Sequence, residues 1–159
     1  MKIKTGIGFD AHRFKADREL FIGGVKIESP IGLDGHSDAD VLIHAIIDAL
    51  AGPTLAKDIG NIFPDTDQAY KNIDSKLLLA ETIKLIGNSG FEISSIDAEI
   101  IAQRPKMAPY IEPMRITLSK ILDIPLEDIT IKATTTEKMG FAGRGEGIAA
   151  LAIATVIKG

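Results

Sequence analysis

The sequence contains no cysteine and no tryptophan, and aromatic residues make up 5% of its 159 residues. Without cysteine, the chain has neither disulfide bonds nor thiolate metal ligands. Hydrophobic residues still account for 45% of the sequence, so aliphatic side chains must supply the core, as in a sheet packed under helices. A chain of this length buries such a core without cross-links, and we expect one domain over residues 1–159.

Excess positive charge and long apolar segments are also missing. Lysine and arginine number 18 against 22 aspartates and glutamates, which gives a formal net charge of −4, whereas a nucleic-acid partner would require a basic surface. The opening segment, MKIKTGIGFDAH, lacks the apolar stretch of a signal peptide. The longest apolar run, GIAALAIATVI, is too short to cross a bilayer. We therefore expect a cytoplasmic protein that binds neither nucleic acid nor membrane.

The hydrophobic pattern predicts a mixture of strands and helices. Residues 2–9 alternate, which is typical of a strand, with one side formed by Ile3, Thr5, Ile7 and Phe9. Two short apolar runs around Gly23-Gly24 indicate a hairpin within residues 20–27. Helices are predicted over 36–52 (capped by Ser37 or Asp38 and closed by Gly52), 74–90 and 109–122. Further strands are predicted over 91–103, 128–137 and 146–158. We therefore expect an α+β fold, a mixed sheet with helices packed on one face and an N-terminal hairpin.

Histidine is rare, and each of the three lies in the first third of the chain, two to four positions from an aspartate: His12, His36 and His44. Asp10 and His12 would leave the end of the first strand on one face, and Asp40, His44 and Asp48 share one side of the following helix. One carboxylate and two imidazoles suit a zinc-type ion with one open coordination position. Asp40 or Asp48 would then orient an imidazole from behind. Spacing alone leaves open the alternative that these are ordinary surface or hydrogen-bonded histidines.

Four other stretches carry groups that suit a phosphorylated ligand. GHSD (35–38) precedes a helix start, where phosphate is attracted, and DIGNIFPDTD (58–67) is a loop rich in carboxylates. AQRPKMAP (102–109) is basic, and KATTTEKMGFAGRGEG (132–147) combines hydroxyls with a glutamate that suits magnesium. Its glycines match neither a P-loop nor a dinucleotide fingerprint. Each stretch has a plain alternative as a cap, a solvated loop or a basic turn. Together they indicate a metal-assisted reaction on a phosphorylated small molecule.

Six motifs, in this order, resemble those of the 2-C-methyl-D-erythritol 2,4-cyclodiphosphate synthase family: GFDAH, HSDADVLIHAIIDAL, DIGNIFPDTD, IIAQRPKM, IKATTTEKMGF and GRGEGIA. The resemblance extends from Gly8 to Ile157. It implies a lyase of the non-mevalonate pathway of isoprenoid (terpenoid) biosynthesis. Such an enzyme converts 4-diphosphocytidyl-2-C-methyl-D-erythritol 2-phosphate to the 2,4-cyclodiphosphate and releases CMP. The resemblance also implies an α+β homotrimer with active sites between neighbouring subunits.

The same resemblance implies roles for individual residues. Asp10, His12 and His44 would hold one zinc-type ion (Zn, Mn or Co), and Glu137 would bind Mg or Mn on the substrate diphosphate. The catalytic residues would be His36 and Thr135, which stabilise charge on the reacting phosphate. The substrate would contact Asp10, His12, His36, Ser37, Asp58, Ile59, Gly60, Phe63, Pro64, Asp65, Thr66, Asp67, Ala102, Gln103, Arg104, Pro105, Lys106, Met107, Ala108, Thr134, Thr135, Thr136, Glu137, Phe141 and Arg144.

The sequence departs from the family pattern at Pro53 and Lys57, where small residues are expected, although no matched functional residue is lost. Two other functions stay open. A metal-dependent phosphohydrolase would use the same aspartate and histidines with an activated water. A non-catalytic trimeric effector-binding protein would bind cytidine nucleotides without turnover.

Overall fold

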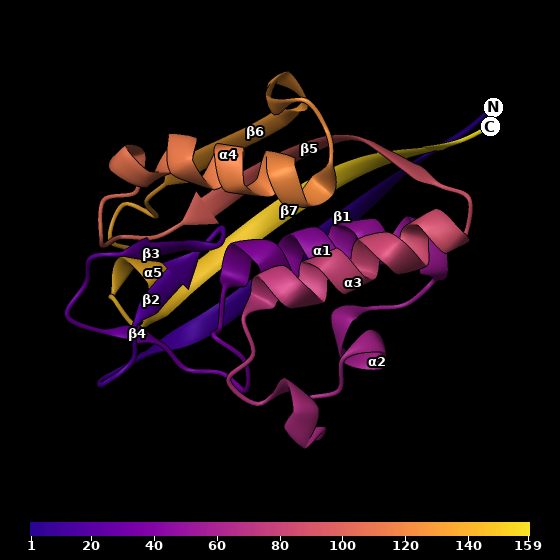
Figure 1. Cartoon of the computed structure of the whole chain (residues 1–159). Coiled ribbons are helices and arrows are strands. Elements are labelled where there is room, and N and C mark those ends of the chain that lie inside the picture. Colours follow the sequence, from indigo (N-terminus) through magenta and orange to yellow (C-terminus); the bar gives the residue numbers. More distant parts are fainter.

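The computed structural model describes residues 1–159 and contains a five-stranded sheet with the strand order β4-β1-β7-β5-β6 (Figure 1). Its strands are β1 (Lys2–Lys15), β4 (Gly32–Leu33), β5 (Glu92–Ile101), β6 (Ile129–Thr134) and β7 (Gly147–Lys158). β1 and β5 pair antiparallel with β7, whereas β5 and β6 are parallel. A separate hairpin, β2 (Leu20–Ile22) and β3 (Val25–Ile27), turns at the two glycines. The predicted mixed sheet and N-terminal hairpin are confirmed.

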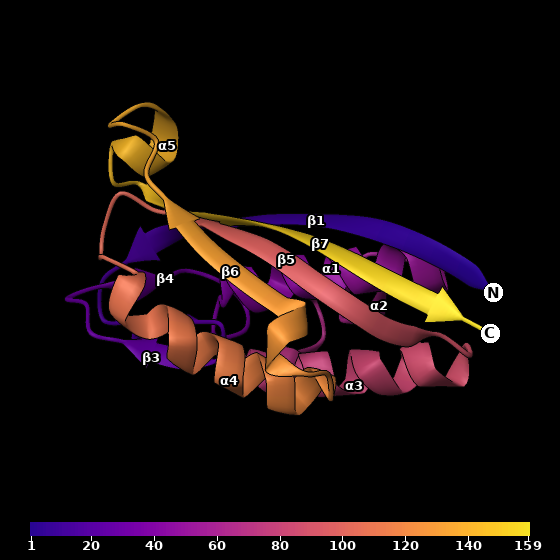
Figure 2. The ribbon, with the colours of Figure 1, turned by 90° about the horizontal axis from the view of Figure 1, so that it is seen from above.

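The three long helices cover one face of the sheet, as predicted, and the short α5 lies on the other side (Figure 2). The long helices are α1 (Val41–Leu55), α3 (Ser75–Asn88) and α4 (Ile111–Leu122). The short ones are α2 (Ile59–Ile62), α5 (Gly140–Gly143) and the 3-10 turns Gln68–Tyr70, Ala108–Tyr110 and Leu126–Asp128. Buried hydrophobic residues form one cluster of 34 between helices and sheet. None of the helices combines the length and the apolar character that crossing a membrane requires.

The backbone of α1 lies directly on β1 because two strand residues have no side chain. A Cβ atom added to Gly6 would lie 2.0 Å from the carbonyl oxygen of Ala49, and one added to Gly8 would lie 1.9 Å from that of Ala45. Only glycine permits such an approach. Successive side chains of a strand alternate between its faces. Asp10 and His12 therefore continue this glycine row on the face that α1 covers.

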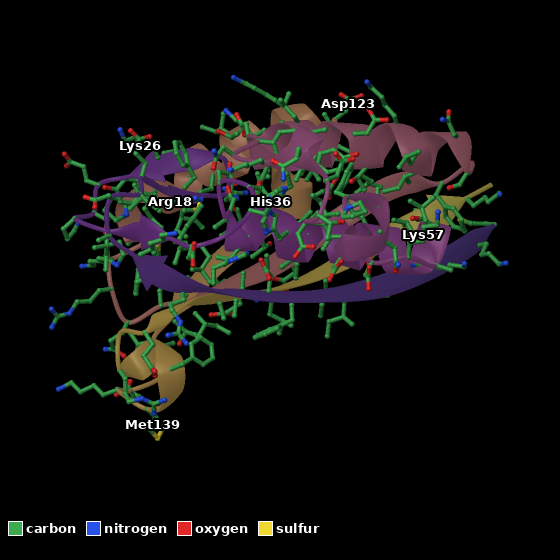
Figure 3. The ribbon with its side chains drawn as sticks, turned by 90° about the horizontal axis from the view of Figure 1, so that it is seen from below. Arg18, Lys26, His36, Lys57, Asp123 and Met139 are labelled. Carbon is green, nitrogen blue, oxygen red and sulfur yellow. The ribbon has the colours of Figure 1, made fainter.

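The opposite face of β1 is apolar, and no element of the chain covers its side chains. Ile7 is 68% exposed and Phe9 is 55% exposed, and Ile3 and Ile153 are exposed as well. Figure 3 shows side chains projecting from this face, with Met139 at the tip of the segment that carries α5 on the same side. A contiguous apolar surface of this kind is typical of an interface.

The boundaries of α1 and β1 differ from the prediction. α1 begins at Val41 rather than after Ser37 or Asp38, because the side chain of Asp40 accepts from the backbone N–H of Ile43 and caps the helix. It also continues through Gly52 and Pro53 to Leu55. Pro53 removes only one hydrogen bond, to the Ala49 carbonyl that Gly6 faces. β1 continues past Phe9 to Lys15 because β7 pairs with it as far as Arg13 and β4 pairs with Phe14 and Lys15.

Candidate metal centre and neighbouring cavity

The side chains of Asp10, His12 and His44 converge where α1 crosses β1. Asp10 Oδ2 lies 2.9 Å from His12 Nε2 and 3.0 Å from His44 Nδ1, and the two ring nitrogens lie 3.3 Å apart. His44 is buried, while Asp10 and His12 are half-buried. Asp10 and His12 lie within β1 rather than at its end, which corrects the predicted position but keeps them on one face. The predicted three-residue cluster is thus formed within one chain.

The chemistry of these atoms fits a divalent cation. His12 Nδ1 donates to the carbonyl oxygen of Asp34 at 2.7 Å, so the unprotonated Nε2 of a neutral ring faces the cluster. Burial alone would raise the pKa of Asp10, but the hydrogen bonds and charges that the His12 and His44 rings supply when protonated lower it to about 2, so Asp10 is an ionised carboxylate. Ligands at about 2.0–2.1 Å from a tetrahedral ion lie about 3.3 Å from one another, close to the observed spacing. The triad can therefore hold a zinc-type ion with a fourth position open.

Neither aspartate predicted to orient an imidazole does so. Asp40 is fully buried, and its carboxylate accepts from the backbone N–H groups of Gly23 and Gly24, at 2.9 and 2.8 Å, and of Ile43. Asp48 accepts from the backbone N–H of Ile59 at 2.7 Å. The prediction fails because the two carboxylates instead accept from backbone N–H groups of a turn and of helix starts. Asp40 secures the β2–β3 hairpin to α1, and Asp48 secures the start of α2.

The segment 58–67 lies beside His36, which donates from Nε2 to the carbonyl oxygen of Asp67 at 2.8 Å. Asp58 caps α2 through the N–H of Asn61, while Phe63 is buried and packs edge-to-face on Tyr70. The rest of the segment is exposed or half-buried: Ile59, Gly60, Pro64, Asp65 and Thr66. The stretches 35–38 and 58–67, both of which the sequence assigned to one substrate, therefore lie together in the structure. His36 and Ser37 do not lie at the N-terminus of α1, since Asp40 occupies its cap.

The segments 102–108 and 134–138 also lie together. The N–H of Ala102 donates to the carbonyl oxygen of Thr134 at 2.9 Å, and Gln103 Oε1 accepts from the N–H of Lys138 at 3.2 Å. Glu137 is exposed, and its own N–H donates to Thr135 Oγ1 at 3.2 Å. Both stretches were assigned to the nucleotide and phosphate groups. Of the remaining predicted residues, Pro105 and Thr136 are half-buried, Met107 is buried and Ala108 is exposed.

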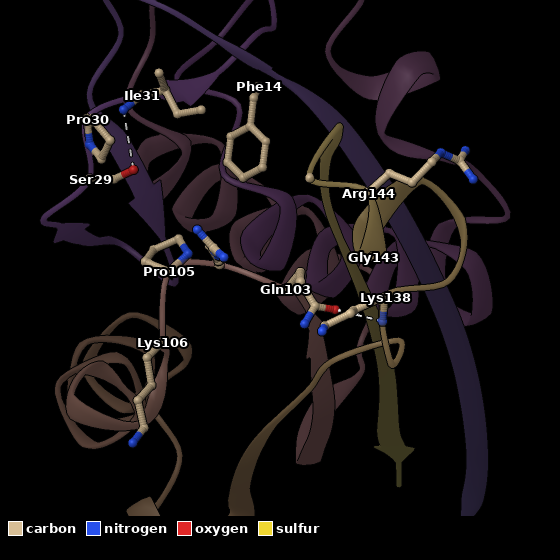
Figure 4. Close-up of a pocket in the computed structure, with 12 residues that line it drawn as sticks. Phe14, Ser29, Pro30, Ile31, Gln103, Pro105, Lys106, Lys138, Gly143 and Arg144 are labelled. Carbon is tan, nitrogen blue, oxygen red and sulfur yellow. Dashed lines mark hydrogen bonds between the residues drawn. The ribbon is translucent and has the colours of Figure 1, made fainter.

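A cavity of about 790 Å³ opens between these segments and the loop before β4 (Figure 4). Its lining includes Arg104, Lys106, Lys138 and Arg144 and no acidic residue, while Phe14 and Ile31 supply its apolar surface. Phe141 lies instead beside His12 in a smaller depression of about 190 Å³. The larger cavity suits an anionic ligand with an apolar or aromatic part. None of the three metal ligands lines it.

Sequence reasoning missed three groups that surround the triad. The Asp34 carbonyl has no side-chain signature, so no pattern could have found it. Ser75 Oγ lies 2.9 Å from His44 Nε2, and its hydroxyl donates to Asp38. The sequence indicated Ser75 and Asp38 only as helix caps. The signal in both cases was a short polar residue followed by an apolar helix, which does not distinguish a cap from a partner of a histidine.

The fold and the site together are those of an enzyme with a triad able to hold a metal ion and a cavity suited to an anionic small molecule. The model of the YgbB family matches residues 3–157, and the chain belongs to this family. The 2-C-methyl-D-erythritol 2,4-cyclodiphosphate synthase of Parabacteroides distasonis is 57% identical over 152 residues, 96% of this chain and 94% of the relative. That of Phocaeicola vulgatus is 52% identical over 158 residues, 99% of each chain. The chain is accordingly a lyase of isoprenoid biosynthesis, as the sequence predicts.

Solved structures agree with this assignment. The bifunctional IspDF from Campylobacter jejuni superposes with a TM-score of 0.93 at 42% identity, covering 98% of this chain and 42% of the larger protein. A CDP complex of IspF from Plasmodium falciparum superposes with a TM-score of 0.85 at 31% identity, covering 98% of this chain and 96% of that one. The predicted α+β fold is thus shared with solved members of the family.

Proposed function

We propose that this chain converts 4-diphosphocytidyl-2-C-methyl-D-erythritol 2-phosphate to the 2,4-cyclodiphosphate and CMP, using the residues described above. The observation that carries the proposal is the convergence of Asp10, His12 and His44 in a chain of the YgbB family. The 2-phosphate oxygen forms a bond to the β-phosphorus, the bond from that phosphorus to the bridging oxygen breaks, and CMP leaves with the oxygen. No protein nucleophile is needed, because the attacking and leaving groups belong to one molecule.

The main obstacle to this reaction is that the attacking and attacked groups are both anionic. Divalent ions, zinc-type at the triad and Mg or Mn at Glu137, would supply positive charge when bound. His36 donates its Nε2 hydrogen to the carbonyl oxygen of Asp67, so the other ring nitrogen, Nδ1, is the one left to face a phosphate oxygen. Ser37 and Thr135 hydroxyls donate to the same oxygens as charge develops on them.

The cavity supports the remaining substrate contacts. Arg104 and Lys106 pair with phosphate oxygens, and the backbone of residues 102–108 with Thr134 and Thr136 surrounds the cytidine. The segment Asp58 to Gly60 meets the ribose, and Phe63 to Asp67 meets the methylerythritol. Phe141 and Arg144 complete the boundary of the substrate. These roles follow the family resemblance, and they agree with the two groups of segments that lie together in the fold.

We further propose that the active protein is a homotrimer with each site between two subunits. Two observations support this arrangement. The cationic cavity contains none of the metal ligands, so one chain alone separates the two halves of the site. The apolar face with Ile3, Ile7 and Phe9 is exposed in one chain, and burial against neighbouring copies would remove it from water.

Incubation with the diphosphocytidyl substrate and magnesium tests the proposal. We expect CMP in equal amount to a cyclic diphosphate identified by phosphorus NMR, and no turnover after the metals are removed with a chelator. Release of inorganic phosphate would indicate a phosphohydrolase instead. Binding of cytidine nucleotides without any turnover, in protein loaded with metal, would indicate an effector-binding protein.

A further inference from the structure

The two ring nitrogens of His44 lie in different surroundings. Nδ1 faces Asp10 and His12, whereas Nε2 faces two hydroxyl groups, Ser37 Oγ at 3.1 Å and Ser75 Oγ at 2.9 Å. A neutral imidazole carries one hydrogen, so the tautomer decides whether Nδ1 has a free electron pair for a cation. The hydroxyl groups behind the ring therefore bear directly on metal binding.

The hydroxyl hydrogen of Ser75 is already committed to another partner. It is donated to Asp38 Oδ1, while the backbone N–H of Ser75 donates to Asp38 Oδ2 at 2.9 Å. An ionised carboxylate only accepts hydrogen bonds, so Ser75 Oγ presents only electron pairs to His44. Placing the hydrogen of the ring on Nδ1 would set two electron pairs against each other at 2.9 Å in a fully buried contact. On the other side of the ring, Nδ1 faces Asp10 Oδ2 at 3.0 Å, so a cation at the triad, which takes the electron pair of Nδ1, is what places the hydrogen on Nε2, where Ser75 Oγ accepts it.

We propose that Asp38 and Ser75 are positioning residues for the metal centre: they hold His44 with its hydrogen on Nε2 and so present Nδ1 to the ion. This inference rests on the metal site of the proposed function and adds two residues to it. Ser75 is the first residue of α3, a helix that supplies none of the three metal ligands. The contact makes the packing of α3 against α1 part of the metal site.

The arrangement has a consequence for Ser37. Its oxygen accepts from His44 Nε2 and from the backbone N–H of Ala39 at 3.3 Å. Because both contacts use electron pairs of the oxygen, the hydroxyl hydrogen of Ser37 is left for another acceptor. A phosphate oxygen of the substrate is such an acceptor. The hydrogen bonds that hold His44 for the metal thus leave the hydroxyl of Ser37 as a hydrogen-bond donor.

Nitrogen NMR on the unaltered protein loaded with zinc tests the tautomer without any variant. Long-range ¹H–¹⁵N spectra at a pH of about 9, where an imidazole is neutral, distinguish the protonated nitrogen from the bare one. Only three histidines are present, so His36→Gln identifies one ring, and Ser75→Ala, which alters the surroundings of the ring it contacts, identifies His44. We expect hydrogen on Nε2. Hydrogen on Nδ1 would overturn the proposal.

Zinc affinity provides the second test, measured by competition with a chromophoric chelator. Ser75→Ala removes the acceptor, and loss of such an outer partner weakens metal binding about 10–100-fold. Thr82→Val is the matched control, since it removes a buried hydroxyl of α3 that donates to the Leu78 carbonyl. We expect the control to keep the parent affinity. If folded Ser75→Ala binds zinc within twofold of the parent, the positioning role is wrong while the metal site stands. If the parent itself binds no zinc, the metal site of the proposed function is wrong.

Discussion

His12 Nε2 and His44 Nδ1 lie 3.3 Å apart, although the residues are 32 positions apart in the sequence and belong to a strand and a helix. Different nitrogens of the two rings meet because each ring is held from behind, His12 by the Asp34 carbonyl and His44 by hydroxyl groups. The rings can approach because α1 lies directly on the glycine row of β1. The metal centre is therefore a property of one helix–strand contact, and changes in that contact should alter metal binding.

The first prediction concerns a metal ligand. His44→Ala removes one of three ligands, and zinc affinity should fall by more than the roughly 100-fold that loss of an outer partner costs. The fold should survive, because the cavity left behind borders the half-exposed metal site. Zinc content after dialysis and a circular-dichroism melting curve measure both effects. Zinc content equal to that of the parent in the folded variant would refute the assignment.

The second prediction concerns the contact that creates the site. In Gly8→Ala, the new Cβ would meet the backbone of Ala45 at 1.9 Å, and no side-chain rotation relieves a clash with backbone. The helix must move off the strand, so we expect the free energy of unfolding to fall by about 3 kcal/mol or more. Zinc binding should weaken in the same variant. Gly87→Ala is the control, since an added Cβ meets nothing there. Equal urea midpoints for the two variants would contradict the prediction.

The four longer strands of the sheet and the metal triad could be predicted from the sequence because their signals are local, whereas the two-residue strand β4 was not predicted. Alternation within residues 2–9 indicates a strand, and Asp10 with His12 follows at the same period. The ends of elements were less predictable, because distant partners set them. β1 reaches Lys15 because β7 pairs with it as far as Arg13 and β4 pairs with its last two residues. α1 begins at Val41 because Asp40 caps it while also binding the glycines of the hairpin.

The partners of the histidines could not be predicted, for a related reason. Ser75 contacts His44 across 31 positions, and its side chain is also an ordinary choice for a helix start. Asp34 acts through its carbonyl oxygen, which every residue has. The sequence identified the charged and imidazole groups of the site, whereas the groups that orient them became visible only in the packed structure.

The third prediction concerns pH and Asp40. Burial, together with the charge of Asp38, raises the pKa of Asp40 from 3.8 to about 6. Between these values the folded chain keeps a proton that the unfolded chain has released, so stability falls as the pH rises from about 4 to 6. The full effect is about 3 kcal/mol, since one pKa unit corresponds to about 1.4 kcal/mol. Asp40→Asn cannot titrate and should lose this slope.

Urea unfolding at several pH values between 4 and 7 measures the difference between the parent and Asp40→Asn. Asp123→Asn serves as the control, because Asp123 is exposed and lies at the end of α4. Its stability should follow the parent at every pH. Parallel curves for the parent and Asp40→Asn would show that Asp40 does not titrate in this range.

The fourth prediction concerns the second ion. Glu137 is exposed, and its carboxylate takes part in none of the ion pairs of the chain. If it holds the ion that bridges the diphosphate, Glu137→Gln removes one negative charge from that site. The magnesium concentration for half-maximal turnover should then rise about tenfold or more, while zinc at the triad stays near the parent content. An unchanged magnesium dependence would exclude this role.

The fifth prediction concerns the assembly. His44→Ala damages the metal half of a site, and Lys106→Ala damages the cationic cavity, which none of the metal ligands lines. The two variants, each inactive alone, are unfolded, mixed in equal amounts and refolded together. In a ring of identical interfaces each site takes its metal half from one subunit and its cavity from the next. Each half is intact with even odds, so roughly a quarter of the sites should be intact.

A second mixture provides the matched control. His12→Ala and His44→Ala both damage the metal half, so every site in their mixed trimers carries a lesion and mixing should restore nothing. Native mass spectrometry of subunits that differ in mass shows whether mixed trimers form. Once they are present, activity of the first mixture no higher than the average of its separate variants would place the whole site within one subunit. Activity near a quarter of the parent in the first mixture and none in the second requires that the metal centre and the cavity meet across a subunit boundary.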